Sequence, residues 1–450
     1  MKIRKVKYNN HHVLGNLEMD FLNPRTNEPY NTVILIGENG TGKTTVLSTL
    51  SDFFNSVSLQ PFQYIEYEAD GHLYHIEPIN NGVAGFHTRC EIGSNAMESI
   101  SRSKNINAYQ MYADKKDLRS YPSVFSKARA DYKVTKISGI STTLLDTEIH
   151  EQDNKDDYTS LKQLIVDIYD QDSRDYMNQN KGAQMLWDVF YSTSRIFRFA
   201  NAFNHFFDKV KFDRIETVNQ DNLILFKKNG KDVPIDNLST GEKQIVYRGA
   251  FLLKNSGIID DGAVFIDEPE LSMHPAWQRR ILNYFQNLYK NPDGKLRAQL
   301  FFASHSEYVV ASALEHYNDN LVVVLNENDG VINSRSITMP LVLPSITASE
   351  INYAAFGIPS VDYHIALYGA IQSKFGVHSI SDCDSKIESC APYYNADQHE
   401  AITASPSGTI YKTVCTKVRN HIDHPDTAPA YTEEEMQKSI ILMRDICMNL

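Results

Sequence analysis

A run of glycines that ends in Lys and Thr is the feature that most constrains how this chain can fold. Residues 37–44 read Gly-Glu-Asn-Gly-Thr-Gly-Lys-Thr, which is the spacing of a phosphate-binding loop. An apolar, mostly β-branched run at 32–36 precedes the loop, and apolar residues at helical spacing follow it as far as Phe54. A strand and a helix are needed on either side because backbone N–H groups must converge on phosphate oxygens. The pattern therefore predicts an α/β protein that binds a nucleoside triphosphate.

Each residue of the loop would make a different contact with a nucleoside triphosphate. Lys43 would neutralise the charge of the β- and γ-phosphates, and the Thr44 hydroxyl would reach Mg²⁺. A Gly-rich turn with this spacing by chance is the alternative, and it would not need the flanking strand and helix. The predicted nucleotide-binding residues of this segment are Gly37, Asn39, Gly40, Gly42, Lys43, Thr44 and Thr45.

Length and composition exclude several classes of protein. The 450 residues are 42% hydrophobic and 22% charged, enough for a large core and more than one unit. The formal net charge of −12 argues against a surface that grips nucleic acid as a whole, although a local basic groove is compatible with it. The sequence shows neither a long apolar run nor a signal core, and the five cysteines are scattered. We therefore expect a cytoplasmic protein that does not enter a membrane.

Strand and helix patterns alternate in the second half of the chain. Apolar strands are predicted at 263–266, 300–303 and 321–325, with helices at about 275–290 and 306–314. This alternation indicates a mostly parallel sheet that is covered on both faces.

The rest of the chain divides into regions of different composition. Strand patterns at 1–36 and 60–95 predict an antiparallel β-lobe, and the polar stretch at about 96–215 predicts a compact helical insertion. The pattern changes again at the prolines near residue 340. We therefore expect a nucleotide-binding domain over residues 1–335 and a separate helical domain over 336–450.

Two carboxylates and a histidine follow buried strands. Asp267 and Glu268 come at the end of the strand at 263–266, where one can hold the Mg²⁺ shell and the next can polarise an attacking water. His305 follows the strand at 300–303 and could sense the terminal phosphate. A capping loop after the first strand and an ordinary structural histidine after the second are the alternatives.

A second candidate anion site precedes a predicted helix. Residues 238–244 read Leu-Ser-Thr-Gly-Glu-Lys-Gln, and Ser239 with the backbone around Gly241 could bind a γ-phosphate at the helix N-terminus. The same Ser-x-x-Glu spacing is typical of a capping box, so both interpretations remain open.

The order of these segments resembles that of the ATP-binding-cassette ATPases, in the soluble branch that includes chromosome-maintenance and DNA-repair ATPases. Residues 271–275 take the place of that family's D-loop, and the resemblance covers residues 1 to about 335. The signature reads Leu-Ser-Thr-Gly-Glu where transporters usually carry Leu-Ser-Gly-Gly-Gln. The resemblance implies ATP and Mg²⁺ as cofactors, ATP hydrolysis, and a homo-oligomer in which the signature loop of one copy closes over the nucleotide of another.

The tail resembles that of bacterial defence ATPases encoded beside an HNH nuclease, such as the ATPase subunit of the Septu anti-phage system. This resemblance implies a subunit that senses infection and regulates a nuclease partner. An alternative is a HEPN-like ribonuclease, since Arg419 and His424 match the Arg-polar-x-x-x-His pattern of that class. Helix termination before Pro425 would explain the same residues structurally. A DNA-repair-type ATPase that binds DNA directly is a third possibility, although no long coiled-coil arm or basic stripe is visible.

Overall fold

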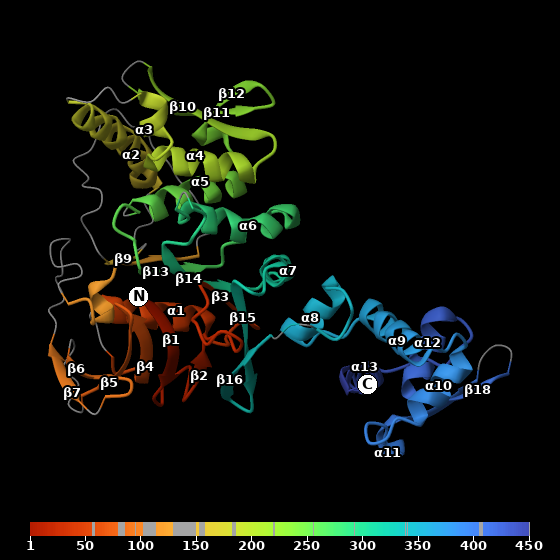
Figure 1. Cartoon of the computed structure of the whole chain (residues 1–450). Coiled ribbons are helices and arrows are strands. Elements are labelled where there is room, and N and C mark those ends of the chain that lie inside the picture. The colour runs from red at the N-terminus through yellow and green to blue at the C-terminus, as the bar shows by residue number, and fades with distance from the viewer. Residues whose placement is uncertain are drawn as a thin grey trace. The chain divides into compact units, whose positions relative to one another are not determined.

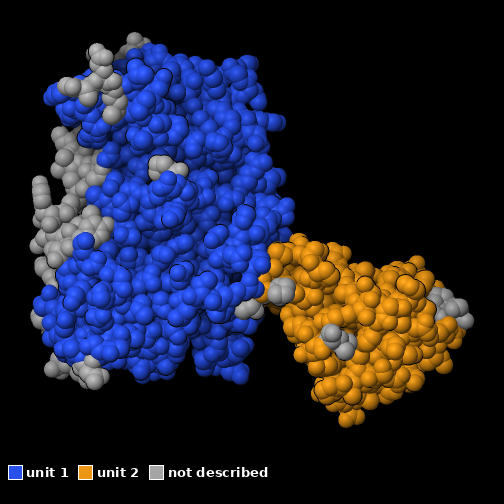
Figure 2. Space-filling view, in the orientation of Figure 1, with its two compact units in different colours: residues 1–336 blue, residues 337–450 orange. Residues whose placement is uncertain are grey.

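The computed structural model describes most of the chain (Figure 1). The described residues are 1–55, 59–79, 86–94, 96–101, 114–128, 150–152, 158–181, 186–218, 221–254, 256–291, 293–337, 339, 341–404 and 408–449. The chain divides into two compact units, residues 1–336 and residues 337–450 (Figure 2).

A seven-stranded sheet forms the centre of the first unit. Its strands, in spatial order, are β16 (Val331–Ser336), β15 (Asn320–Asn328), β3 (Thr32–Ile36), β14 (Ala298–Ser304), β13 (Gly262–Asp267), β8 (Ser123–Ser126) and β9 (His150–Gln152). Every neighbouring pair is parallel except β15 and β16. All residues of β3, β13 and β14 are buried, as expected for parallel strands covered on both faces. The predicted alternation of strand and helix is confirmed.

Four helices of the first unit pack close to this sheet. They are α1 (Lys43–Phe54), α5 (Thr240–Leu253), α6 (Pro275–Leu288) and α7 (Glu307–Glu315). Three of them, α1, α6 and α7, follow strands of the sheet. The start of helix α6 is fixed by a capping side chain and by a proline. The His274 side chain accepts the Ala276 N–H, and Pro275 occupies the first turn, where its missing N–H is not needed.

The antiparallel lobe is a second, six-stranded sheet. In spatial order it contains β2 (Glu18–Asp20), β1 (Lys2–Tyr8), β4 (Phe62–Ala69), β5 (His72–Pro78), β6 (Phe86–Glu91) and β7 (Met97–Ser101). The buried Gln299 side chain on β14 ties the two sheets together. Its Oε1 accepts the Ile3 N–H at 2.7 Å, and its Nε2 donates to the Ile3 carbonyl at 3.0 Å. The antiparallel lobe predicted from the sequence is confirmed, except that the strand at 32–36 belongs to the central sheet as β3.

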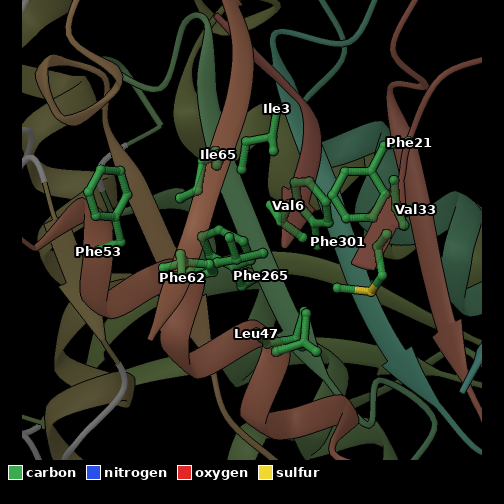
Figure 3. Close-up of a cluster of buried hydrophobic side chains, with 14 of the residues drawn as sticks. Ile3, Val6, Phe21, Val33, Leu47, Phe53, Phe62, Ile65, Phe265 and Phe301 are labelled. Carbon is green, nitrogen blue, oxygen red and sulfur yellow. The ribbon is translucent and has the colours of Figure 1, made fainter. Parts of the chain in front are cut away.

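One apolar cluster joins the lobe, the central sheet and α1 (Figure 3). Phe265 on β13 and Phe301 on β14 stack with ring centroids 5.4 Å apart, and Phe21 meets Phe301 edge-on at the same distance. Leu47 of α1 packs into the same cluster. This packing fixes β13 and β14 beside α1, so the ends of these elements are held in register.

The insertion contains helices and a small sheet. Its helices are α2 (Tyr158–Gln179), α3 (Trp187–Tyr191) and α4 (Arg195–Phe206), and its strands are β10 (Val210–Val218), β11 (Asp221–Lys228) and β12 (Lys231–Pro234). Two short 3₁₀ turns, Leu118–Ser120 and Ile235–Asn237, also belong to the first unit. Helix α4 buries apolar residues at helical spacing, so its aromatic residues pack on the core.

The predicted limits of the helical insertion are wrong at the start. Strands β7 and β8 fall inside the range 96–215, and β8 belongs to the central sheet. Strand β8 carries a weak sequence signal because it has only four residues, two of which are serines. The stretches 102–113, 129–149, 153–157 and 182–185 of this range lie outside the described residues.

The second unit is built mainly of helices. They are α8 (Ala348–Phe356), α9 (Val361–Phe375), α10 (Ile380–Glu388), α11 (Ala396–His399), α12 (Val414–Asp423) and α13 (Glu433–Asn449). They surround a separate apolar core to which α9, α10, α12 and α13 contribute. The helical character predicted for the tail is confirmed. A two-stranded hairpin, β17 (Glu400–Ala404) and β18 (Ile410–Thr413), was missed because strands this short carry little periodic signal.

Candidate nucleotide-binding site

The phosphate loop takes a backbone path that side chains would obstruct. Gly37, Gly40 and Gly42 have φ angles of 147°, 89° and 84°. A Cβ atom on Gly37 would lie 2.3 Å from the Leu325 carbonyl oxygen of the neighbouring strand β15. Glycine is therefore required at position 37 both by its φ angle and by this close approach.

Helix α1 begins directly after the loop without a side-chain cap. Its N-cap residue is Gly42 in the left-handed conformation, and no side chain of the described residues accepts a hydrogen bond from its first turn. The exposed Thr44 and half-buried Thr45 belong to this turn, and the exposed Asn39 and Gly40 belong to the loop. Uncapped N–H groups at a helix N-terminus form a binding site for anions, so this part of the chain fits a phosphate group.

Lys43 is held within the loop rather than in solvent. Its side-chain ammonium donates to the carbonyl oxygens of Gly37 at 2.9 Å and Glu38 at 2.7 Å. Lys43 is only 5% exposed, and burial lowers the pKa of its ammonium to about 8. A cation that is poorly solvated and bonded only to carbonyl oxygens is well suited to exchange them for phosphate oxygens.

Thr44 and Asp267 meet although 223 positions separate them. The Thr44 hydroxyl lies 3.0 Å from both carboxylate oxygens of Asp267, at the end of β13. Burial raises the pKa of Asp267, which is 4% exposed. A hydroxyl and a carboxylate at one point provide the hard oxygen ligands that Mg²⁺ prefers, so these residues fit the predicted ion.

Glu268 and His305 form a second pair beside the first. The Glu268 carboxylate lies 3.3 Å from the His305 Nε2 atom, and each side chain is about one-third exposed. Glu268 has a φ angle of 43°, which is unusual for a residue with a side chain. Strained backbone of this kind is concentrated at functional sites, where the surrounding structure holds it. The pair can therefore orient a water molecule and receive its proton.

Arg248 on α5 holds the backbone that carries both carboxylates. Its guanidinium donates to the Glu268 carbonyl at 2.8 Å, to the Asp267 carbonyl, and to the Ser126 hydroxyl at 3.1 Å. Arg248 is 3% exposed, so these bonds form away from water. Arg248 was not predicted from the sequence, because no pattern links a residue within a helix to strand ends that lie 19 and 122 positions away.

Glu270 was missed as well, and it positions His305. Its Oε1 atom accepts the Ser304 hydroxyl and the His305 backbone N–H, both at 2.8 Å. Its other carboxylate oxygen is buried without a hydrogen-bond partner among the described residues. Burial raises the pKa of this carboxyl group. A third carboxylate two positions after Glu268 was the signal that could have drawn attention to it.

Ser239 and Gly241 lie at the start of α5. Ser239 caps the helix in a complete capping box with Glu242, so the structural interpretation of this motif is correct in this chain. A Cβ on Gly241 would come within 3.1 Å of the Trp277 ring and 3.2 Å of the Ser272 carbonyl. Among the described contacts, no hydrogen bond or ion pair joins Ser239 to residues 37–45.

The structure does not assemble Arg419 and His424 into a site. The Arg419 guanidinium pairs with Asp423 on its own helix, and it lies over the Tyr368 ring with 5.9 Å to the centroid. His424 is exposed at the C-terminal end of α12. Within the described part of the chain, no hydrogen bond or ion pair connects the two residues.

Comparison with known proteins identifies the family of the first unit. The sequence model of the family "AAA domain, putative AbiEii toxin, Type IV TA system" matches residues 33–311, which include the phosphate loop, the paired carboxylates and His305. The chain belongs to this family. It is therefore an ATPase-type nucleotide-binding protein, as the geometry of the site indicates.

One curated protein and two solved structures are also similar to this chain. The "Retron Vc95 probable ATPase" of Vibrio cholerae serotype O1 biovar El Tor is 28% identical over 131 residues, which cover 27% of this chain and 23% of that protein. An SMC head bound to the C-winged helix domain of ScpA has a TM-score of 0.43 at 12% identity, over 75% of this chain and 98% of its own. The SMC head domain from Thermotoga maritima has a TM-score of 0.40 at 14% identity, over 75% of this chain and 100% of its own. The assignment to the family rests on the family match alone.

The helices in the described part of the chain are too short or too polar to cross a bilayer. None of them combines the length and the apolar character that a membrane span requires.

Proposed function

We propose that this chain is the ATPase subunit of a bacterial defence system, which binds ATP with Mg²⁺, hydrolyses it and regulates a nuclease partner. One observation carries the proposal. Three segments distant in sequence bring Thr44 against Asp267, and Glu268 against His305, at the carboxyl ends of the neighbouring strands β3, β13 and β14. The family match and the name of the retron relative support a defence ATPase.

Each residue of the site has a part in hydrolysis. Lys43 and the uncapped start of α1 bind the phosphates, and Thr44 and Asp267 would hold Mg²⁺, which neutralises charge on the phosphate oxygens. Glu268 orients the attacking water and accepts its proton, while His305 keeps the carboxylate in place. Arg248 and Glu270 act as positioning residues, because they hold the backbone of this pair.

The site would be completed by a second copy of the chain. Ser239 is exposed at the N-terminus of α5 and has no described bond to the phosphate loop of its own chain. A symmetric dimer that places this N-terminus over the partner's ATP would use the same surface twice, as two-fold assemblies do. The ATP would then join the two copies.

The second unit is the proposed docking site for an HNH-type nuclease, as in the Septu system that the tail resembles. It has a core of its own and leaves Arg419 and His424 apart, so its described contacts do not favour a ribonuclease site within this chain. Nucleic acid would then be the substrate of the partner.

Replacement of the proposed general base tests the catalytic part of the proposal. We expect Glu268→Gln to lower kcat for ATP hydrolysis about 100-fold or more, because general-base contributions have that size, while ATP still binds. The matched control is Glu315→Gln at the end of α7, which should leave kcat unchanged. Full hydrolysis by Glu268→Gln would overturn the assignment.

Size measurements test the assembly. Light scattering of the Glu268→Gln protein should show a dimer with ATP and Mg²⁺ and a smaller species without them. Ser239→Arg, introduced into that protein, should prevent the ATP-dependent dimer, whereas Asn283→Arg on the exposed face of α6 should not. Dimers that form equally well without ATP would contradict the composite site.

A further inference from the structure

A second cavity lies away from the phosphate loop, within the first unit. Its volume is about 660 Å³, inside the range of about 300–1,000 Å³ in which proteins hold small-molecule ligands. Its walls come from α2, the turn between α3 and α4, α4 itself, the end of α6 and the loop that leads to β14. Helix α4 packs against both α5 and α6, so the cavity sits where the insertion meets the ATPase core (Figure 1).

The cavity is basic although the chain is acidic. Among its lining residues are three arginines and one lysine, against the two carboxylates of Asp172 and Asp175. One of the arginines, Arg297, is paired with Asp260 outside the lining at 2.6 Å, so the positive charge of the lining comes mainly from the others. The whole chain carries a formal charge of −12, so this local excess of positive charge opposes the general trend. A concave basic surface concentrates anions in its interior.

Both carboxylates are bonded to one arginine of the protein. Arg195 donates to the Asp172 carboxylate at 3.1 Å and to the Asp175 carboxylate at 3.3 Å. Asp172 also accepts the Ile196 backbone N–H at 2.8 Å, in the first turn of α4. Arg195 therefore offsets part of this negative charge, and Arg198 and Lys290 supply further positive charge to the lining.

Polar side chains from two neighbouring parts of the chain also line the cavity. Arg198, Asn201 and His205 follow one another along one face of α4. Asn287 on α6 and the residues Lys290 and Asn291, which directly follow that helix, line the cavity as well. Positions three and four apart lie on the same face of a helix, so the residues of α4 form a row along the cavity.

Two of these cations are placed to meet a ligand. The half-buried Lys290 takes part in no ion pair among the described residues. The Arg198 guanidinium donates to the Ser256 hydroxyl at 3.1 Å, and its planar fork carries five N–H groups in all, enough for more than one partner. The aromatic rings of Phe190 and Phe197 complete the lining and give it an apolar face. Cations beside amides and aromatic rings match the chemistry of a nucleotide, whose phosphate is anionic and whose base is flat.

We propose that this cavity is a second ligand site, which binds a small molecule that carries a phosphate group and is about the size of a nucleoside monophosphate. It is separate from the phosphate loop and does not depend on ATP hydrolysis. The ligand would bond to Arg198 and Lys290, and the asparagines of α4 and α6 would orient it.

The site is connected to the ATPase core through its own hydrogen bonds. Ser256, which accepts the bond from Arg198, donates to the Leu253 carbonyl at 2.9 Å. Leu253 is the last residue of α5, the helix that begins at Ser239 and carries Arg248. A ligand held by Arg198 would therefore act on the helix that supports the catalytic carboxylates.

Calorimetric titration of the full chain tests the site. The protein would carry Lys43→Ala, which weakens phosphate binding at the loop, and the probes would be AMP and inorganic pyrophosphate. We expect one saturable site per chain for at least one of the probes. Lys290→Glu should weaken that binding about tenfold or more, because a charge-assisted bond is replaced by a repulsion. The matched control is Lys295→Glu, an exposed lysine outside the lining, which should leave the affinity unchanged.

Two results would overturn the proposal. One is no binding of either probe to the Lys43→Ala protein, and the other is binding that Lys290→Glu leaves intact. If Lys290→Glu lowers the melting temperature, Arg198→Gln serves as the second variant, with the same loss of affinity expected. Because binding rather than hydrolysis is measured, failure here would leave the ATPase assignment unaffected.

Discussion

The two units use buried charges in different ways. In the first unit, Asp267 contacts a hydroxyl and Lys43 contacts loop carbonyls, at strand ends that open onto a loop. In the second unit, Asp384 and Glu350 are buried as well, but each accepts two backbone N–H groups in addition to a side-chain hydroxyl. Glu350 accepts those of Val342 and Leu343 at 2.7 and 3.0 Å. A carboxylate that accepts several groups of its own chain is fixed to the fold, as Glu270 of the first unit also is. Asp267 is bonded through its described contacts to the hydroxyl of one exposed threonine, so it can exchange that partner for a ligand.

The largest expected effect is a loss of stability when a buried carboxylate of the second unit is removed. Asp384 accepts the Lys412 N–H at 2.8 Å and the Thr413 N–H at 3.1 Å, and it is 4% exposed. We expect Asp384→Ala to lower the free energy of unfolding of this unit by about 2–4 kcal/mol, because two N–H groups lose their acceptor. Denaturant unfolding measures this loss, and ATP binding should be unchanged. Asp382→Ala, an exposed position on the same helix, is the control.

A smaller effect on catalysis tests the positioning role of Arg248. We expect Arg248→Lys to lower kcat about tenfold without changing ATP affinity, because lysine cannot span the carbonyls of Asp267 and Glu268 together with Ser126. Steady-state kinetics and equilibrium binding would separate kcat from affinity. Arg279→Lys on the exposed face of α6 should change neither. A loss of affinity with an unchanged kcat would contradict a positioning role.

The pH dependence of ATP binding tests the buried ammonium. Burial lowers the pKa of Lys43 to about 8, so ligand-free protein loses this proton above pH 8 and binding must restore it. The association constant for ATP should therefore be nearly constant below pH 8 and fall by up to about tenfold per pH unit above it. Fluorescence titration from about pH 6.5 to about pH 9.5 measures the profile. Lys43→Arg, which stays charged throughout, should bind ATP with no such fall.

The smallest effect is expected at the candidate ribonuclease residues. Arg419 makes an ion pair within one turn of α12, and such pairs contribute about 0.5 kcal/mol. We expect Arg419→Ala and His424→Ala to change the free energy of unfolding by less than about 1 kcal/mol and to leave protection against phage intact. Loss of protection in either variant, together with RNA cleavage by the purified chain, would restore the ribonuclease hypothesis.

The sequence predicted those parts of the site that lie in short continuous segments. The loop before Lys43, the pair Asp267–Glu268 and His305 each follow an apolar strand, and parallel strands bring their carboxyl ends to one edge. The contacts of Thr44 with Asp267 and of Glu268 with His305 therefore follow from the parallel order of these strands.

Other parts of the site depend on packing that one sequence does not encode in a recognisable pattern. Arg248 reaches the carboxylates only because α5 packs beside β8, and β8 is too short to be recognised. The polar residues on α4 and at the end of α6 line one cavity only after the two helices pack. In the sequence these residues are spread from 198 to 291. The Ser-x-x-Glu spacing at Ser239 fits both a capping box and an anion site. Only the contacts in the structure show that it forms a capping box in this chain.

The capping box at Ser239 also sets a condition on assembly. The Ser239 hydroxyl donates to the Glu242 carboxylate at 2.9 Å, and Lys228 pairs with the same carboxylate at 2.9 Å. A phosphate delivered by a second copy would have to compete with this internal anion for the hydroxyl. Only a fully charged triphosphate, with Lys228 nearby to screen the two anions, would compete well. Because ADP has no γ-phosphate to compete for the hydroxyl, the proposed dimer would form with ATP and not with ADP.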